Sequence, residues 1–138
     1  MDPPRTHLKI KENLVGRPLE IFTEDHALVE LKTSEDMVAD DKGLIHGGFI
    51  FGLADYAAML AVNHPNVILK EAKVKFIKPV KLGCTLLAEA KIVARVVDTK
   101  GKEERLVEVI VKRKEDGVQV FRGEFRCIIL PRHVLELK

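Results

Sequence analysis

The segment from residue 44 to residue 63, LIHGGFIFGLADYAAMLAVN, constrains the fold more than any other stretch of the chain. Drawn as a helix, it carries apolar side chains on nearly its whole circumference, so other parts of the protein must enclose it. A helix that crosses a bilayer needs about 20 predominantly apolar residues. Here His46, Asp55 and three glycines interrupt the run, and we interpret the segment as a buried helix. We expect it to begin at Gly47 or Gly48 and to end near Asn63, where Asn-His-Pro-Asn is typical of a helix stop.

Alternating apolar and polar residues predict strands before and after this helix. Turn signals, such as Thr99-Lys-Gly101 and Glu115-Asp-Gly117, separate the segments that follow it. We expect these segments to form a long antiparallel meander. A further strand is expected at residues 27–33, and a short helix or an irregular cover at residues 6–15. The four segments after the helix are residues 67–77, 85–98, 105–114 and 119–130.

The order of these elements predicts an α+β fold in which the helix packs against one face of the sheet. A chain of 138 residues with 46% hydrophobic and 32% charged residues suits a single domain with one core. We expect residues 1–138 to form this domain, with residues 1–20 as an N-terminal cover segment and residues 131–138 as a C-terminal tail.

Charge and cysteine content limit the partners and the location of the protein. The net charge is +2, with acids and bases interleaved, so we expect neither a nucleic acid nor a membrane surface as a partner. Cys84 and Cys127 have no zinc or C-x-x-C spacing, which favours free thiols in a reducing compartment. The N-terminal residues lack the apolar core of a secretory signal. A cytoplasmic protein is therefore expected.

Asp55 is the only acidic or basic residue between His46 and His64. Burying an ionised carboxylate without partners costs so much that such groups are usually neutral, paired or excluded from cores. Two interpretations stay open on these residues alone. Asp55 is either a catalytic carboxylate or a core acid that accepts hydrogen bonds from backbone N–H groups or from a lysine on a neighbouring strand.

The pair Gly47-Gly48 stands where the helix is expected to begin. Free N–H groups at a helix start, without side chains around them, can bind an oxyanion or polarise a carbonyl. Alternatively, the glycines only permit close packing. Asp55 lies eight positions later, about 12 Å along a helix axis. That distance is too long for one helix to present both groups to one carbonyl, so a site that uses both would need two chains.

The run His46-Gly-Gly-x6-Asp55, together with Phe76-Ile-Lys-Pro-Val-Lys-Leu-Gly83, resembles the hotdog-fold thioesterases, in particular the PaaI-type acyl-CoA thioesterases. The resemblance extends from about residue 40 to about residue 129. It implies a sheet wrapped around a central helix, two chains paired edge to edge, and often a dimer of such dimers. It also implies an active site at the interface, with Asp55 as nucleophile or general base and the Gly47 N–H of the partner chain as oxyanion donor.

Two positions depart from the family pattern. Asp40 stands where members commonly have an asparagine, and Leu69 stands where some members have a serine or threonine. We expect both, with Gly48, to lie in the substrate site. Lys73 and Lys78 are expected to bind the phosphates of coenzyme A, although lysines of this kind are also common on solvated strand faces.

The resulting hypothesis is an acyl-CoA thioesterase that needs no metal or redox cofactor and uses His46 for structure or substrate contact more than as a base. The alternative is a non-catalytic, sensor-type acyl-CoA-binding module, which the altered positions 40 and 69 motivate. A hotdog dehydratase is disfavoured by the setting of His46. The acyl length and the choice between coenzyme A and acyl carrier protein are open.

Overall fold

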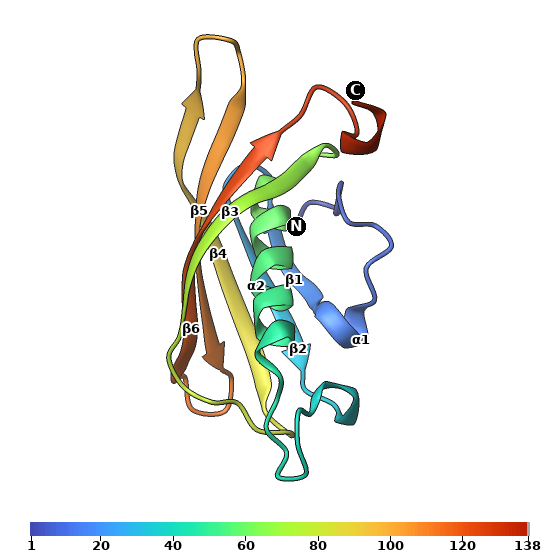
Figure 1. The fold of residues 1–138 in the computed structure, drawn as a ribbon, viewed down its shortest axis with the longest axis vertical. Coiled ribbons are helices and arrows are strands. Elements are labelled where there is room, and N and C mark those ends of the chain that lie inside the picture. Colours follow the sequence, from blue (N-terminus) through green and yellow to red (C-terminus); the bar gives the residue numbers. More distant parts are fainter. Residues whose placement is uncertain (138) are drawn as a thin grey trace.

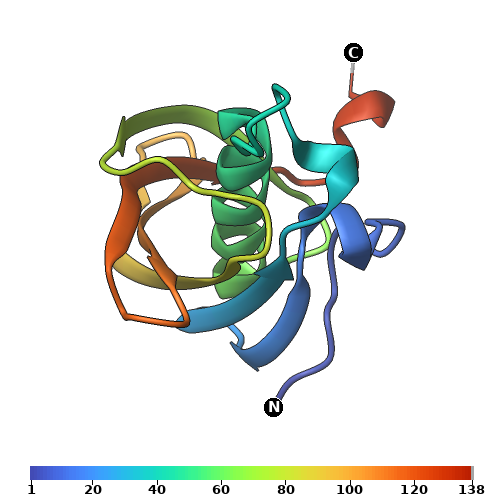
Figure 2. The same cartoon turned by 90° about the horizontal axis from the view of Figure 1, so that it is seen from below.

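The computed structural model describes residues 1–137, which form a curved antiparallel sheet wrapped around one long helix (Figure 1). The strand order is β1-β2-β4-β5-β6-β3. Viewed along the helix, the sheet encloses it from one side like an open barrel (Figure 2). The strands are β1 (Arg17–Phe22), β2 (His26–Lys32), β3 (Val67–Phe76), β4 (Thr85–Val97), β5 (Glu103–Arg113) and β6 (Gln119–Ile129).

The long helix, α2, runs from Gly47 to Val62, which confirms the predicted bounds. Asn63 ends it in the left-handed conformation (φ 51°, ψ 46°), and the Asn63 N–H donates to the Met59 carbonyl at 2.7 Å. Every residue from Ala57 to Val62 is buried. The enclosure expected from the apolar circumference is therefore present. Among residues 1–137, no helix has both the length and the apolar character that spanning a membrane requires.

The predicted meander is correct for β4, β5 and β6 but wrong for β3, which pairs with β6 and forms an edge of the sheet. Its place beside β4 is taken by β2. The cause is the connection between β3 and β4. Residues 77–84 cross the end of the sheet, where the Val80 carbonyl accepts a hydrogen bond from the Ile45 N–H at 2.9 Å. The turn signals at Lys78-Pro79 and Gly83 thus belong to a crossing connection and not to a hairpin.

The N-terminal cover segment is shorter than predicted. Residues 1–16, including α1 (Glu12–Val15), pass over α2, but Arg17–Glu20 belong to β1 and pair with β2. Pro18 and a bulge between Pro18 and Glu20 weaken the period-2 pattern that would have revealed this strand. Gly16 has φ 133°, and a Cβ there would lie 2.7 Å from Val29 Cγ1. Only glycine fits where the chain turns from the helix into the sheet.

Asn63 fastens the cover segment to the end of α2. Its side chain is fully buried, accepts a hydrogen bond from the Arg5 N–H at 2.7 Å, and donates to the Pro3 carbonyl and to Thr23 Oγ1. These bonds satisfy a buried amide and join the cover segment, α2 and the β1–β2 turn.

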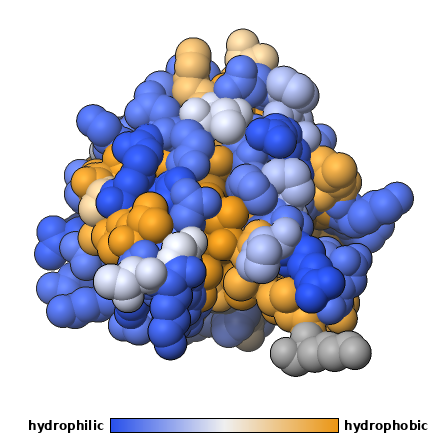
Figure 3. Space-filling view, turned by 90° about the horizontal axis from the view of Figure 1, so that it is seen from above, coloured by the Kyte–Doolittle hydropathy of each residue, from blue (hydrophilic) through white to orange (hydrophobic). Residues whose placement is uncertain are grey.

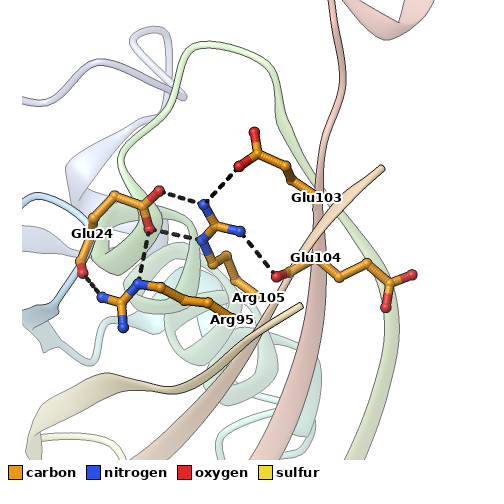
Figure 4. A network of polar contacts seen from close by, with 5 residues as sticks. All are labelled: Glu24, Arg95, Glu103, Glu104 and Arg105. Carbon is orange, nitrogen blue, oxygen red and sulfur yellow. Dashed lines mark hydrogen bonds and ion pairs between the residues drawn. The ribbon is translucent and has the colours of Figure 1, made fainter. Parts of the chain in front are cut away.

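A charged cluster joins the β1–β2 turn to the protruding β4–β5 hairpin (Figure 4). The Arg105 guanidinium is nearly buried and donates to both carboxylate oxygens of Glu24, at 2.8 and 2.9 Å. Arg95 also contacts Glu24, and Arg105 donates to the Glu103 carboxylate and to the backbone carbonyl of Glu104. The hydrogen bond from Arg105 lowers the pKa of Glu24. At this end of the molecule, apolar residues form separate patches among charged ones (Figure 3).

The chain after β6 leaves the sheet and contains one short 3-10 turn at Val134–Glu136. Position 138 of the predicted C-terminal tail lies outside the described residues.

Candidate functional site

Asp55 lies within α2 and is largely withdrawn from solvent. Its Oδ1 atom is buried and has no hydrogen-bond partner within residues 1–137. Burial raises the pKa of Asp55 from 3.8 to about 6. Oδ1 therefore lacks the bonds that a structurally satisfied core acid would make. A half-buried acid with a pKa raised to about 6 suits a role in proton transfer or nucleophilic attack.

Residues of β6 and β3 border this carboxylate. Phe51, one helical turn before Asp55, packs against Phe125 of β6 with ring centroids 5.5 Å apart. Burial, with the charge of Asp55 as a second cause, raises the pKa of Cys127 to about 12. The Cys127 thiol is thus not activated as a nucleophile. Leu69 of β3 pairs in register with Cys127 beside a bulge, so the structure brings Leu69 to the same region as Asp55.

The start of α2 presents free backbone donors. His46 occupies the N-cap position with φ −61° and ψ 129°, and its side chain makes no capping bond. The Phe49 N–H donates to the His46 carbonyl at 3.1 Å, whereas the N–H groups of Gly47 and Gly48 have no acceptor in the part of the chain that the structure describes. These two amides, at the positive end of the helix dipole, can bind a carbonyl or an oxyanion.

Both glycines are also closely packed. A Cβ on Gly47 would lie 3.1 Å from Cε1 of Phe76, and a Cβ on Gly48 would lie 2.9 Å from Nε2 of His46. The imidazole of His46 is exposed and stands edge-on to the Phe49 ring at 6.2 Å. The two glycines therefore permit close packing at this end of α2 and also leave their backbone N–H groups free.

Asp40 shapes the loop that leads into α2. Its Oδ1 accepts hydrogen bonds from the N–H groups of Lys42, at 3.0 Å, and Leu44, at 3.1 Å. The His46 N–H then donates to the Met37 carbonyl at 2.9 Å. Asp40 thus lies near the start of α2 and holds the backbone around it.

The two predicted phosphate-binding lysines lie in different places. Ala72 and Val74 pack against the core, so Lys73 between them points to the opposite, convex face of the sheet. Within one chain, Lys73 is not brought to Asp55. Lys78 lies just after β3, where its N–H donates to the Val120 carbonyl at 3.2 Å. Because nearby Phe76 is close to Gly47, Lys78 belongs to the region around the helix start.

Sequence reasoning did not assign a site role to two neighbours, Phe76 beside Gly47 and Cys127 beside Asp55. Phe76 is half-exposed and is the first residue of the motif that ends at Gly83. Its place in that motif could have indicated a role in the site. The proximity of Cys127 to Asp55 depends on strand register, and no local pattern indicates it. Within residues 1–137, no group of three or more His, Cys, Asp or Glu side chains is arranged to hold a metal ion.

A family model described as the thioesterase superfamily matches residues 42–96. The methylthioribose-1-phosphate isomerase of Aquifex aeolicus is 51% identical over 126 residues, which are 91% of this chain but 26% of that protein. The transcription factor FapR of Caldanaerobacter subterraneus is 27% identical over 89% of this chain and 58% of its own length. The chain thus spans about a quarter of the first relative and little over half of the second.

Solved structures share the fold. A protein of Pyrococcus horikoshii described as uncharacterized is 50% identical, with a TM-score of 0.87 and 98% coverage of each chain. A Streptococcus mutans protein bound to acetyl-CoA is 21% identical, with a TM-score of 0.75 and coverage of 93% and 99%. A hypothetical thioesterase of Streptococcus pneumoniae with coenzyme A is 18% identical, with a TM-score of 0.72 and coverage of 85% and 87%. The chain has the hotdog fold of these solved structures, and its residues 42–96, which include the helix-start motif and Asp55, match the thioesterase superfamily.

Proposed function

We propose that this protein hydrolyses an acyl-CoA thioester to the free acid and coenzyme A, at a site shared by two copies of the chain. The observation that carries the proposal is Asp55, a half-buried carboxylate whose Oδ1 is buried without a partner within residues 1–137 and whose pKa is raised to about 6. The match of residues 42–96 to the thioesterase superfamily supports the reaction class. The isomerase and transcription-factor relatives are longer proteins, and their names do not transfer to this chain.

In the proposed reaction, ionised Asp55 takes a proton from a water molecule whose oxygen attacks the thioester carbonyl carbon. The oxyanion forms opposite the free N–H at the start of α2, supplied by Gly47 of the second copy. Collapse of this intermediate breaks the carbon–sulfur bond, and the thiolate of coenzyme A takes up a proton. Direct attack by Asp55, through an anhydride that water then hydrolyses, is the second route that the same geometry supports.

The need for two copies follows from the length of α2. Gly47 and Asp55 are eight residues apart in one continuous helix, about 12 Å along its axis. A second copy paired along the β3 edge can place its own helix start near Asp55, because β3 is an edge strand of the described sheet and its Leu69 pairs with Cys127, which lies beside Asp55. We therefore propose a homodimer or a dimer of such dimers.

The ligand assignment draws on the neighbours with bound coenzyme A and acetyl-CoA. Gly48 and Leu69 are proposed to contact the acyl and thioester part, with Asp40 fixing the loop beside it. Lys78 is the proposed phosphate ligand near the helix start. Lys73 faces away from Asp55 of its own chain, so its role in substrate binding requires that the nucleotide extend across the sheet edge. His46 is proposed to hold the loop that leads into α2. We also propose that the protein is cytoplasmic.

Deprotonated Asp55 is the active form in either route, so the proposal fixes the direction of the pH dependence. Because burial raises the pKa to about 6, turnover should fall as the pH drops through about 6. An exposed aspartate would keep activity down to about pH 4.

A second candidate function is acyl-CoA binding without hydrolysis. The relatives that are transcription factors favour it, because a segment of a regulator can bind a ligand without hydrolysing it. The departures at Asp40 and Leu69 also favour it.

Release of free thiol from short, medium, long and aryl acyl-CoAs separates the two candidates. Wild type should turn over at least one class, and Asp55→Asn should lose most of that turnover while still binding the same compound in calorimetry. Asp41→Asn removes an exposed carboxylate and is the matched control. Tight binding of an acyl-CoA by wild type without any thiol release would select the binding module. Equal turnover by wild type and Asp55→Asn would exclude Asp55 as the catalytic group.

A further inference from the structure

Gly52, in the middle of α2, is the one glycine of this chain that the fold itself does not require. Five of the nine glycines have a positive φ, between 72° and 133°, which other residues rarely adopt. Three more leave no room for a side chain, because an added Cβ would lie 2.8–3.1 Å from a neighbouring atom. The first group is Gly16, Gly43, Gly83, Gly101 and Gly117, and the second group is Gly47, Gly48 and Gly123.

Gly52 belongs to neither group. Its φ is not positive, and an added Cβ would meet no atom of residues 1–137 within 4 Å, apart from its two chain neighbours and the backbone of its own helix. Glycine in a helix interior is less stable than alanine, because it loses more conformational freedom on folding. A single chain would therefore gain stability from alanine at this position. A glycine that the fold does not need indicates that something outside the described chain uses the space.

The open space at Gly52 adjoins Asp55. Residues three apart on a helix are neighbours on its surface, and Gly52 lies three positions before Asp55, about 4.5 Å along the helix axis. Oδ1 of Asp55 is buried without a partner within residues 1–137, which is a separate sign that this side of α2 faces a ligand. In the proposed reaction, the carbonyl carbon of the thioester lies beside this carboxylate. Gly52 is therefore within reach of the first atoms bonded to that carbon.

The surroundings of Gly52 favour the acyl group of the substrate over its coenzyme A arm. Phe49 and Phe51, both half-buried, lie on either side of Gly52 on the surface of α2. Backbone N–H and C=O groups in the middle of an α-helix bond to one another, so they offer no partners to the amide groups of the coenzyme A arm. An apolar acyl group needs no such partners and gains from contact with aromatic rings.

We propose that the acyl group of the substrate packs over Gly52, and that the absence of a side chain there makes room for bulk next to the thioester carbonyl. Gly52 is then a specificity-determining residue, which contacts the substrate but takes no part in making or breaking bonds. The substrate class that it admits is an acyl group with a branch at the carbon bonded to the carbonyl. This inference rests on the proposed function, because it uses the position of the thioester beside Asp55.

Pairs of isomeric acyl-CoAs test this role, because the two members contain the same atoms and differ only in where the acyl chain branches. Suitable pairs are isobutyryl-CoA with butyryl-CoA, and 2-methylpentanoyl-CoA with hexanoyl-CoA. Gly52→Ala should lower kcat/KM for the branched member relative to the straight one by about 10-fold or more, the effect of one methyl-sized group in an apolar pocket. Gly52→Leu should lower this ratio further. The straight isomer, measured on the same variant, is the matched control for general damage to the site.

Binding measurements separate this inference from the proposed hydrolysis. The same pairs are measured by calorimetry in chains that carry Asp55→Asn, with and without Gly52→Ala. The added alanine should raise the Kd of the branched isomer relative to that of the straight isomer. If no acyl-CoA is hydrolysed but this change in Kd is found, the proposed function fails and the role of Gly52 stands. If hydrolysis is found but alanine and leucine leave the preference between isomers unchanged, the role of Gly52 fails and the proposed function stands.

Thermal unfolding and native mass spectrometry of Gly52→Ala identify what occupies the space. The variant should unfold at a higher temperature than wild type, because alanine stabilises a helix interior and its Cβ meets no neighbour in the chain. Its mass should equal that of wild type. A lower unfolding temperature together with a smaller assembly would show that a second copy fills the space at Gly52, and this result would overturn the proposal.

Discussion

Replacing Asp55 with asparagine should make the fold more stable at neutral pH. Burial raises the pKa of Asp55 from 3.8 to about 6. At about 1.4 kcal/mol for each pKa unit, holding the ionised carboxylate in the folded chain costs about 3 kcal/mol. Asparagine carries no charge and has nearly the same shape, so it avoids this cost. A residue retained at such a cost is expected to serve function rather than stability.

The pH dependence of this effect has a definite sign. Below pH 3.8 the carboxyl group is protonated in both the folded and the unfolded chain, and Asp55→Asn should change the stability little. As the pH rises from about 4 to about 6, the unfolded chain releases its proton first, which destabilises the wild type relative to the variant. Above pH 6 the advantage of the variant should be constant at about 3 kcal/mol.

Guanidinium unfolding followed by circular dichroism, at pH 7.5 and at the lowest pH where both proteins fold, measures this difference. All proteins must be compared at one chain concentration, because assembly contributes to stability. Asp41→Asn, at an exposed position, is the control and should change the free energy of unfolding by less than about 0.5 kcal/mol. If Asp55→Asn proves less stable than wild type at pH 7.5, the carboxylate makes stabilising hydrogen bonds and is a structural acid.

Three further predictions concern other buried groups. Arg105→Met should lower the free energy of unfolding by about 1–3 kcal/mol, because it removes the paired hydrogen bonds to partly exposed Glu24. Arg105 lowers the pKa of Glu24, so the difference in the free energy of unfolding between wild type and Arg105→Met should be largest above pH 4.5. The difference should disappear at lower pH, where Glu24 is protonated. A difference that does not change in acid would contradict the pairing. Asn63→Gly keeps the left-handed helix end but removes three hydrogen bonds to the cover segment and the adjoining turn. Limited proteolysis should therefore cut the cover segment faster in the variant than in wild type. An unchanged cleavage rate would show that these bonds do not hold the cover segment. Iodoacetamide should modify Cys84 but not Cys127, which is fully buried and has a pKa raised to about 12. Mass spectrometry of the native protein after labelling should therefore find one label per chain. Two labels per chain would show that Cys127 is accessible.

Local patterns sufficed for α2 and for most strands. The glycines at 47 and 48 and the Asn-His-Pro stop define the helix within a few residues, and strict alternation defines β4, β5 and β6. β1 was not predicted because Pro18 and a bulge disturb the short alternation of apolar and polar residues in this strand. The position of β3 at the sheet edge depends on how residues 77–84 cross the sheet, and such a non-local path leaves no periodic signal.

The candidate site was predictable where burial conflicts with charge. Asp55 stands out because no other charged residue occurs in the segment that must be enclosed. The outward direction of Lys73 was also available in principle, since Ala72 and Val74 alternate with it. In contrast, the proximity of Leu69 to Cys127, and of Cys127 to Asp55, is set by the register of β3 on β6 and by the helix packing above it. Single-sequence patterns do not encode that register.

In the proposed site one copy supplies Asp55 and the other supplies the N–H of Gly47, and mixing two inactive variants tests this sharing. Gly47→Pro removes the N–H at the first position of α2, where proline is tolerated. His46 already has the extended conformation that precedes proline. Gly47→Ala retains the N–H and brings its Cβ equally close to Phe76, so it is the matched control and should keep most activity.

Gly47→Pro should lower kcat by about 10²- to 10³-fold, the effect of losing one oxyanion donor. Asp55→Asn and Gly47→Pro chains, unfolded together and refolded at equal concentrations, should then regain thiol release. About half of the dimers should be mixed, each with one intact site of its two, so about a quarter of wild-type turnover is expected. Turnover no higher than that of the separate variants, in a sample that native mass spectrometry shows to contain mixed dimers, would contradict a site shared between two copies.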